Sequence, residues 1–99
     1  MALGPVGQRI TAKLMAELRP DSLEVIDESH LHEGHAGSHP SGESHFRVRI
    51  VASQFAGQGR VMRHRMINTV LADDLATRVH ALAIEAYAPG ERGGDSKPG

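Results

Sequence analysis

Histidine is the residue type of this chain whose number and spacing are best suited to chemistry. Seven occur in 99 residues, and five of these fall within residues 27–46: His30, His32, His35, His39 and His45. Neutral imidazole is a ligand for zinc, iron, copper and nickel. The same stretch contains several glycines and no cysteine, so it predicts a loose loop that is a poor metal cage by itself. Two interpretations stay open: a loop histidine belongs to an incomplete metal site, or these histidines are solvated.

The composition restricts the class of protein. Hydrophobic residues make up 39% and aromatic residues 3% of the chain, which predicts one small domain with an aliphatic core. The formal net charge of −1 predicts no strong attraction of the whole molecule to nucleic acid or membrane. The absence of cysteine excludes a disulfide and a catalytic thiol. No apolar stretch approaches the roughly 18 residues that a membrane span needs, and we expect a cytoplasmic protein without a membrane partner.

The spacing of apolar residues predicts an α/β (α+β) domain with the element order α-β-β-α-β. The expected elements are a helix from Val6 that Pro20 ends, a strand over residues 23–28, the histidine loop over 29–43, a strand over 44–52, a helix over 61–75 and a strand over 79–86. Flanking these we expect a flexible N-terminus over residues 1–5 and a disordered tail over 89–99, so that a single domain occupies residues 6–88.

This element order predicts where the remaining two histidines lie. Strands that are separated by a helix run parallel, whereas the first two strands, joined by one loop, run antiparallel. A mixed three-stranded sheet with two helices on one face would bury the apolar stripes. Parallel strands begin at the same end of a sheet, so His80 should lie beside the histidine loop. His64, at the start of the second helix, should lie at the opposite end. His45 should pack or form a hydrogen bond on the wet face of its strand.

The segment RVMRHR, residues 60–65, concentrates positive charge at a helix N-terminus. Arg60, Arg63 and Arg65 there oppose the helix dipole by roughly 0.3–1 kcal/mol per charge, so local stability does not explain them. One interpretation is that they and His64 form a site for nucleic-acid phosphate or an acidic partner. The other is that each arginine is solvated and paired with an acidic residue elsewhere.

Signatures of an enzyme are missing from the sequence. It contains no nucleophile elbow, no HExxH and no glycine-rich phosphate loop ahead of a helix. The adjacent acids at 27–28 and 73–74 do not face one another as a catalytic pair would, and we expect them to be solvated. A non-enzymatic role is therefore predicted.

Four segments, in the order LEVIDESH, GESHFRVRIV, FAGQGRVMRHRM and VHALAIEAY, resemble the BolA family. The resemblance covers about residues 6–88. It implies an α-β-β-α-β fold similar to a type II KH domain, and a non-enzymatic partner of monothiol glutaredoxins in iron–sulfur cluster handling and iron regulation. Some bacterial members are linked to transcription, which agrees with the alternative of DNA binding through residues 60–65.

The resemblance also implies a ligand set. Family members of this type hold a [2Fe–2S] cluster jointly with the glutaredoxin, whose cysteine and glutathione supply thiolates. The histidine of the VHAL segment, here His80, is one ligand. Counting forward from DES, the loop ligand matches His32, and the inserted HEGHAG makes His35 a competitor. The isolated chain is expected to be a monomer or a weak homodimer.

Overall fold

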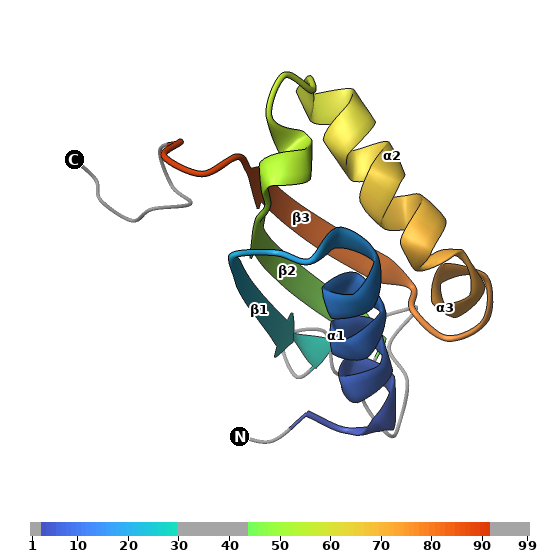
Figure 1. The fold of residues 1–99 in the computed structure, drawn as a ribbon. Helices are drawn as coiled ribbons and strands as arrows, with labels where there is room; N and C mark the ends of the chain where they lie inside the picture. The colour runs from blue at the N-terminus through green and yellow to red at the C-terminus, as the bar shows by residue number, and fades with distance from the viewer. Residues whose placement is uncertain (1–2, 30–43, 92–99) are drawn as a thin grey trace.

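The computed structural model describes residues 3–29 and 44–91 of the chain. These residues form helices and strands in the expected order, with one additional short helix before the last strand (Figure 1). The elements are α1 (Pro5–Leu18), β1 (Ser22–Asp27), β2 (His45–Val51), the 3-10 turn η2 (Ser53–Phe55), α2 (Arg60–Val70), α3 (Ala72–Thr77) and β3 (Ala81–Tyr87).

Helix α1 follows directly from its sequence. Pro5 occupies its first turn, where the fixed φ of proline suits a helix and the missing N–H has no intrahelical partner. Its inward-facing residues are spaced four apart and are buried: Val6, Ile10, Leu14 and Leu18. The helix ends where Arg19 adopts a left-handed conformation with φ 45°.

The three strands form one mixed sheet in the order β1-β2-β3. Strand β1 pairs antiparallel with β2, and β2 pairs parallel with β3. His45, the first residue of β2, is in register with Ala81, the first residue of β3. The topology predicted from the element order is confirmed.

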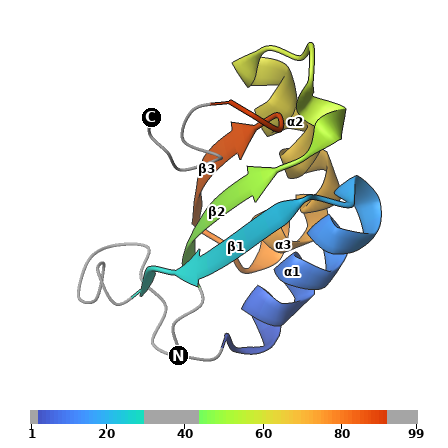
Figure 2. The ribbon, with the colours of Figure 1, turned by 60° about the vertical axis from the view of Figure 1, so that its left-hand side comes forward.

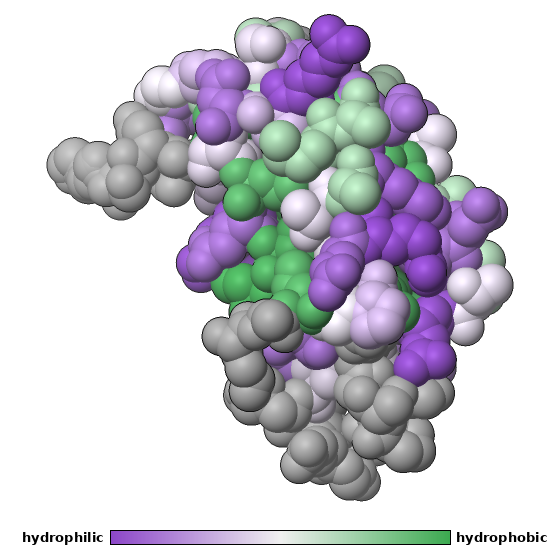
Figure 3. Space-filling view, turned by 60° about the horizontal axis from the view of Figure 1, so that its bottom comes forward, coloured by the Kyte–Doolittle hydropathy of each residue, from purple (hydrophilic) through white to green (hydrophobic). Residues whose placement is uncertain are grey.

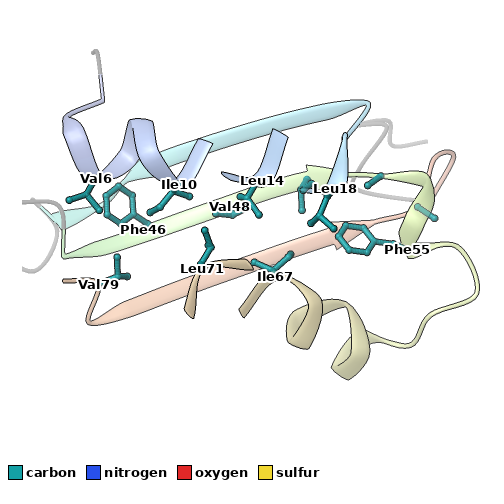
Figure 4. Close-up of a cluster of buried hydrophobic side chains, with 13 residues drawn as sticks. Val6, Ile10, Leu14, Leu18, Phe46, Val48, Phe55, Ile67, Leu71 and Val79 are labelled. Atoms are coloured by element: carbon teal, nitrogen blue, oxygen red, sulfur yellow. The ribbon is translucent and has the colours of Figure 1, made fainter. Parts of the chain in front are cut away.

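All three helices cover the same face of the sheet (Figure 2). The alternation in HFRVRIV is confirmed, because Phe46, Val48 and Ile50 are buried beneath the helices. They pack in one cluster with residues from α1 and α2 (Figure 4), among them Leu14 and Ile67. The other face of the sheet carries the charged residues of β2.

The predicted helix over 61–75 is wrong in one respect, because it is broken at Leu71. Leu71 has φ −102° and ψ 17°, which ends α2, and α3 starts at Ala72. The change of direction leaves Leu71 only 1% exposed and also turns Asp74 toward α1. The apolar spacing of the segment is consistent with the burial of Leu71, whereas the burial of Asp74 is a tertiary effect that helical periodicity does not encode.

The expectation that Asp74 is solvated is also wrong. Its side chain is 2% exposed and accepts hydrogen bonds from Arg9 Nε at 2.7 Å and from Lys13 Nζ at 2.8 Å. Burial raises the pKa of Asp74, but the hydrogen bonds from Lys13 and Arg9 outweigh burial, and the pKa lies below its ordinary value. Asp74 thus ties α3 to α1.

The described chain continues beyond β3 to Glu91, whose backbone N–H donates to the carbonyl of Ala88 at 3.1 Å. Most of the tail expected over 89–99 lies outside the described residues, as do residues 1–2. The large hydrophobic side chains that stay exposed in the described ranges are Met15, Val61 and Met62. On the face shown in Figure 3, green hydrophobic surface is bordered by purple hydrophilic surface. No helix within 3–29 or 44–91 has the length and hydropathy of a membrane span.

Candidate metal-ligand site and basic segment

His80 lies immediately before β3, at the end of the sheet where β2 also begins. Its backbone N–H donates to the carbonyl of Ser44 at 2.7 Å, and the N–H of Ala81 donates to the same oxygen at 3.2 Å. The imidazole of His80 is exposed and stacks on that of His45, with 6.3 Å between ring centroids and 26° between ring planes. The predicted convergence of His80 with the end of the histidine loop is confirmed for the described residues.

The two residues that border the undescribed loop are hydrogen-bonded to each other. Ser29 Oγ accepts the backbone N–H of Ser44 at 2.9 Å and that of His45 at 3.2 Å. Ser29 and Ser44 are 5% and 0% exposed. Ser44 Oγ lies 2.8 Å from Nδ1 of His45, so His45 forms the hydrogen bond that its strand position predicted. Both ends of the loop are therefore anchored close to His80.

The histidines inside that loop lie outside the described residues, and these include both predicted loop ligands, His32 and His35. The choice between them stays a prediction. Among residues 3–29 and 44–91, no three side chains of histidine, cysteine, aspartate or glutamate come together as a metal site. Of the predicted ligands, only His80 is among the described residues, with the ring of His45 stacked beside it.

Residues 60–65 lie at the opposite end of the sheet, as predicted. His64 lines a hollow together with the last residues of β3, whereas His80 precedes the first. The hollow is also lined by Arg60 and by two carboxylates, Glu85 and Glu91. Its charges are therefore mixed in sign.

The three arginines of this segment differ in their surroundings. Arg63 is only 12% exposed, donates to both carboxylate oxygens of Glu91 and donates to the carbonyl of Ala86 at 3.1 Å. The pairing raises the pKa of Arg63 and lowers that of Glu91 to about 2, chiefly through the hydrogen bond between them. Arg60 and Arg65 are exposed and form no ion pair with a described residue. Within residues 60–65, these two arginines rather than Arg63 are the ones exposed to solvent for an anion.

The arginines of β2 form a charge ladder on the open face of the sheet. Arg47 donates to Glu28 at 2.8 Å and to Glu85 at 2.9 Å. Arg49 lies 3.3 Å from Glu24 and 3.4 Å from Glu85. The hydrogen bonds that Arg47 donates to Glu28 and Glu85 raise its pKa. The alternation of β2 predicted that these arginines lie on the solvent-facing side of the sheet. Their acidic partners follow only from the register of the three strands.

Comparisons with known proteins agree with this fold. The sequence model of the family described as BolA-like protein matches residues 14–91. A Sinorhizobium protein described as uncharacterized is 54% identical over 85 residues, which are 85% of this chain and 91% of the relative. The DNA-binding transcriptional regulator BolA of Escherichia coli is 48% identical over 82 residues, 83% of this chain and 74% of the relative.

A solved structure agrees in fold as well as in sequence. The BolA domain of SufE1 from Arabidopsis thaliana superposes with a TM-score of 0.81 at 48% sequence identity, covering 89% of this chain and 96% of that chain. The family match over residues 14–91 includes all three strands, and with them the strand ends that carry His45 and His80. On this evidence the chain belongs to the family of BolA-like proteins.

Proposed function

We propose that this chain is a non-enzymatic adaptor that assembles with a monothiol glutaredoxin and shares a [2Fe–2S] cluster with it. His80 supplies one ligand, and a histidine of the loop supplies the other: His32, with His35 as the alternative. The cysteine of the glutaredoxin and glutathione supply the thiolates. In cluster trafficking, the shared cluster is the cargo that the complex delivers. In iron regulation, it is the signal that the complex senses.

The observation that carries this proposal is the position of His80. Its imidazole is exposed, and its backbone is hydrogen-bonded to Ser44, the first described residue after the loop. Ser29, the last described residue before the loop, is bonded to the same Ser44. The two described residues that border the loop therefore lie beside His80, which favours a loop histidine as its co-ligand.

The donors available in this chain also favour a shared cluster. A [2Fe–2S] cluster takes four protein or thiol ligands, and replacing thiolate by histidine on one iron raises its potential. This chain has no cysteine, so its own contribution to the cluster is limited to imidazoles. His80 and one loop histidine supply two imidazoles, which are half of a ligand set, so a partner that brings thiolates completes it.

The test is to mix the protein with a cluster-loaded monothiol glutaredoxin and to record visible circular dichroism. We expect His80→Ala to change the spectrum of the complex, because one iron loses its imidazole. His64→Ala is the matched control, since His64 lies at the other end of the sheet. Identical spectra for wild type and His80→Ala would rule out ligation by His80. His32→Ala and His35→Ala in the same assay distinguish the two loop ligands.

A second candidate function is DNA binding through residues 60–65. Two observations favour it: Arg60 and Arg65 are exposed without an ion pair to the described residues, and a relative at 48% identity is named as a DNA-binding transcriptional regulator. Arg63 contributes less than the sequence suggested, because Glu91 already neutralises it. The carboxylates in the adjacent hollow further restrict how closely a phosphate backbone can approach.

DNA binding is tested by its dependence on salt. If Arg60 and Arg65 each contact a phosphate, Arg60→Ala and Arg65→Ala weaken binding to every sequence and each reduces the salt slope by about 1. Arg49→Ala, on the open face of the sheet, is the control and leaves the slope unchanged. No binding at low salt would exclude this function.

A further inference from the structure

We propose that Ser44, held by Ser29 and acting together with His45, positions the imidazole of His80 for ligation. The proposal rests on the function above, in which His80 is a cluster ligand, and assigns three residues that hold it in place. A positioning role is needed because the His80 side chain is exposed, so that packing alone does not orient it.

A single acceptor, the carbonyl oxygen of Ser44, binds the backbone N–H groups before and after the α-carbon of His80. The carbonyl oxygen of Ser44 accepts the N–H of His80 at 2.7 Å and the N–H of Ala81 at 3.2 Å. These two N–H groups flank the α-carbon of His80. The direction in which its side chain leaves the backbone is therefore set relative to Ser44.

Ser44 is in turn fixed by Ser29, from across the loop. Ser29 Oγ accepts the N–H of Ser44 at 2.9 Å and the N–H of His45 at 3.2 Å. The backbone N–H of Ser29 donates to Asp27 Oδ1 at 2.9 Å, which forms a local turn at the end of β1. This turn holds the backbone of Ser29, whose hydroxyl contacts the start of β2. Both serines are buried, so water does not compete for these bonds.

The ring of His80 has a separate support in His45. The two imidazoles stack with their centroids 6.3 Å apart, and Ser44 Oγ forms a hydrogen bond with Nδ1 of His45 at 2.8 Å. A single serine thus contacts both histidines, His80 through its carbonyl and His45 through its hydroxyl. Partners of this kind, which orient a ligating histidine without binding the metal, set ligand geometry and affinity.

The first measurement needs no cluster. In the protein alone, wild type should show a nuclear Overhauser contact between the ring protons of His45 and His80. Ser29→Ala should lose that contact and shift the His80 ring resonances, whereas Ser29→Thr keeps the hydroxyl and should restore both. Ser53→Ala, an exposed serine in η2, is the matched control.

The second measurement uses the complex with a cluster-loaded monothiol glutaredoxin. His45→Ala and Ser29→Ala are expected to weaken cluster retention by about 10–100-fold and to alter the visible circular dichroism. Ser29→Thr should behave as wild type. Ile67→Val, a remote core variant of modestly lower stability, should leave retention and spectrum unchanged, which separates positioning from general destabilisation.

The outcomes distinguish this proposal from the function on which it rests. If His80→Ala leaves the spectrum of the complex unchanged, His80 is not a cluster ligand, and its positioning for ligation is overturned with that part of the proposed function. If His80→Ala changes the spectrum but His45→Ala and Ser29→Ala do not, His80 is a ligand. In that case only its positioning by Ser29, Ser44 and His45 is overturned. An equal loss in Ile67→Val would likewise overturn the positioning role.

Discussion

The guanidinium of Arg63 holds the carboxylate of Glu91 by two hydrogen bonds, from Nη1 at 2.6 Å and from Nη2 at 2.9 Å. This fork connects the first turn of α2 with the chain that follows β3. Arg63 also lies with its guanidinium carbon 6.0 Å from the centroid of the Phe55 ring. An arginine in a segment that suggested nucleic-acid binding is thus engaged within the fold.

The Arg63–Glu91 pair makes stability depend on acid. The pKa of Glu91 is lowered from 4.5 to about 2 in the folded chain by the hydrogen bond from Arg63. Its contribution to stability is therefore fully present above about pH 4.5 and is lost as the pH falls toward 2. At pH 7, Glu91→Gln should have a lower melting temperature than wild type. This difference in melting temperature should become smaller as the pH approaches 2, because the wild type then loses the contribution of the pair as well.

Thermal melts followed by far-ultraviolet circular dichroism across pH 7 to 2 measure this effect. Glu17→Gln is the control, because Glu17 is exposed and its carboxylate forms no ion pair with a described residue. A constant difference between Glu91→Gln and wild type at every pH would contradict the role assigned to the pair.

Asp74 is expected to be the acidic residue whose loss costs most stability. Asp74→Asn removes two charge-assisted hydrogen bonds at a buried site and should reduce the free energy of unfolding by about 1–3 kcal/mol. Since the pKa of Asp74 lies below its ordinary value, this contribution is present at neutral pH and decreases as the pH falls through the folded pKa. Urea unfolding measures it, with the exposed neighbour variant Asp73→Asn as control. Equal costs for the two variants would show that the bonds to Arg9 and Lys13 are not stabilising.

Gly57 is required for its backbone conformation. It has φ +79°, and a β-carbon built there would meet no atom within 4 Å, so space is not the constraint. Gly57→Ala should destabilise the fold by about 1–2 kcal/mol, because an L-residue disfavours the left-handed region. Gly57→Asn, whose side chain tolerates that region better, should cost less. A comparison of urea midpoints checks the order, and an Ala variant as stable as wild type would contradict it.

Ile67 is the buried residue of α2 and belongs to the core cluster, against which Met66 and Val70 of the same helix also pack. Ile67→Ala should reduce the free energy of unfolding by about 2–5 kcal/mol, the cost of lost burial plus the cavity that remains. The adjacent exposed residue offers a control, and Asn68→Ala should stay within about 0.5 kcal/mol of wild type. Chemical denaturation of both variants tests this, and similar midpoints would show that α2 is only loosely attached.

Much of the fold could be predicted because it depends on local periodicity and on chain connectivity. The four-residue spacing of Val6, Ile10, Leu14 and Leu18 predicted α1 and its buried face. Helix α2 between the last two strands predicted their parallel pairing, and with it the position of His80 beside the loop end. Family likeness supplied the functional hypothesis. The two predicted loop ligands, His32 and His35, lie outside the described residues, and the choice between them stays a prediction.

The sequence by itself thus determined the element order, the topology of the sheet and the separation of His64 from His80. Only the tertiary structure decided which polar groups meet: Arg9 with Asp74, 65 residues apart, Arg63 with Glu91, 28 apart, and Ser29 with Ser44, 15 apart. No local pattern encodes such pairs, because each forms only after packed helices and strand register have brought distant side chains within hydrogen-bond distance. For the same reason the stacking of His45 on His80, the contact that defines the candidate site, was visible only in the folded chain.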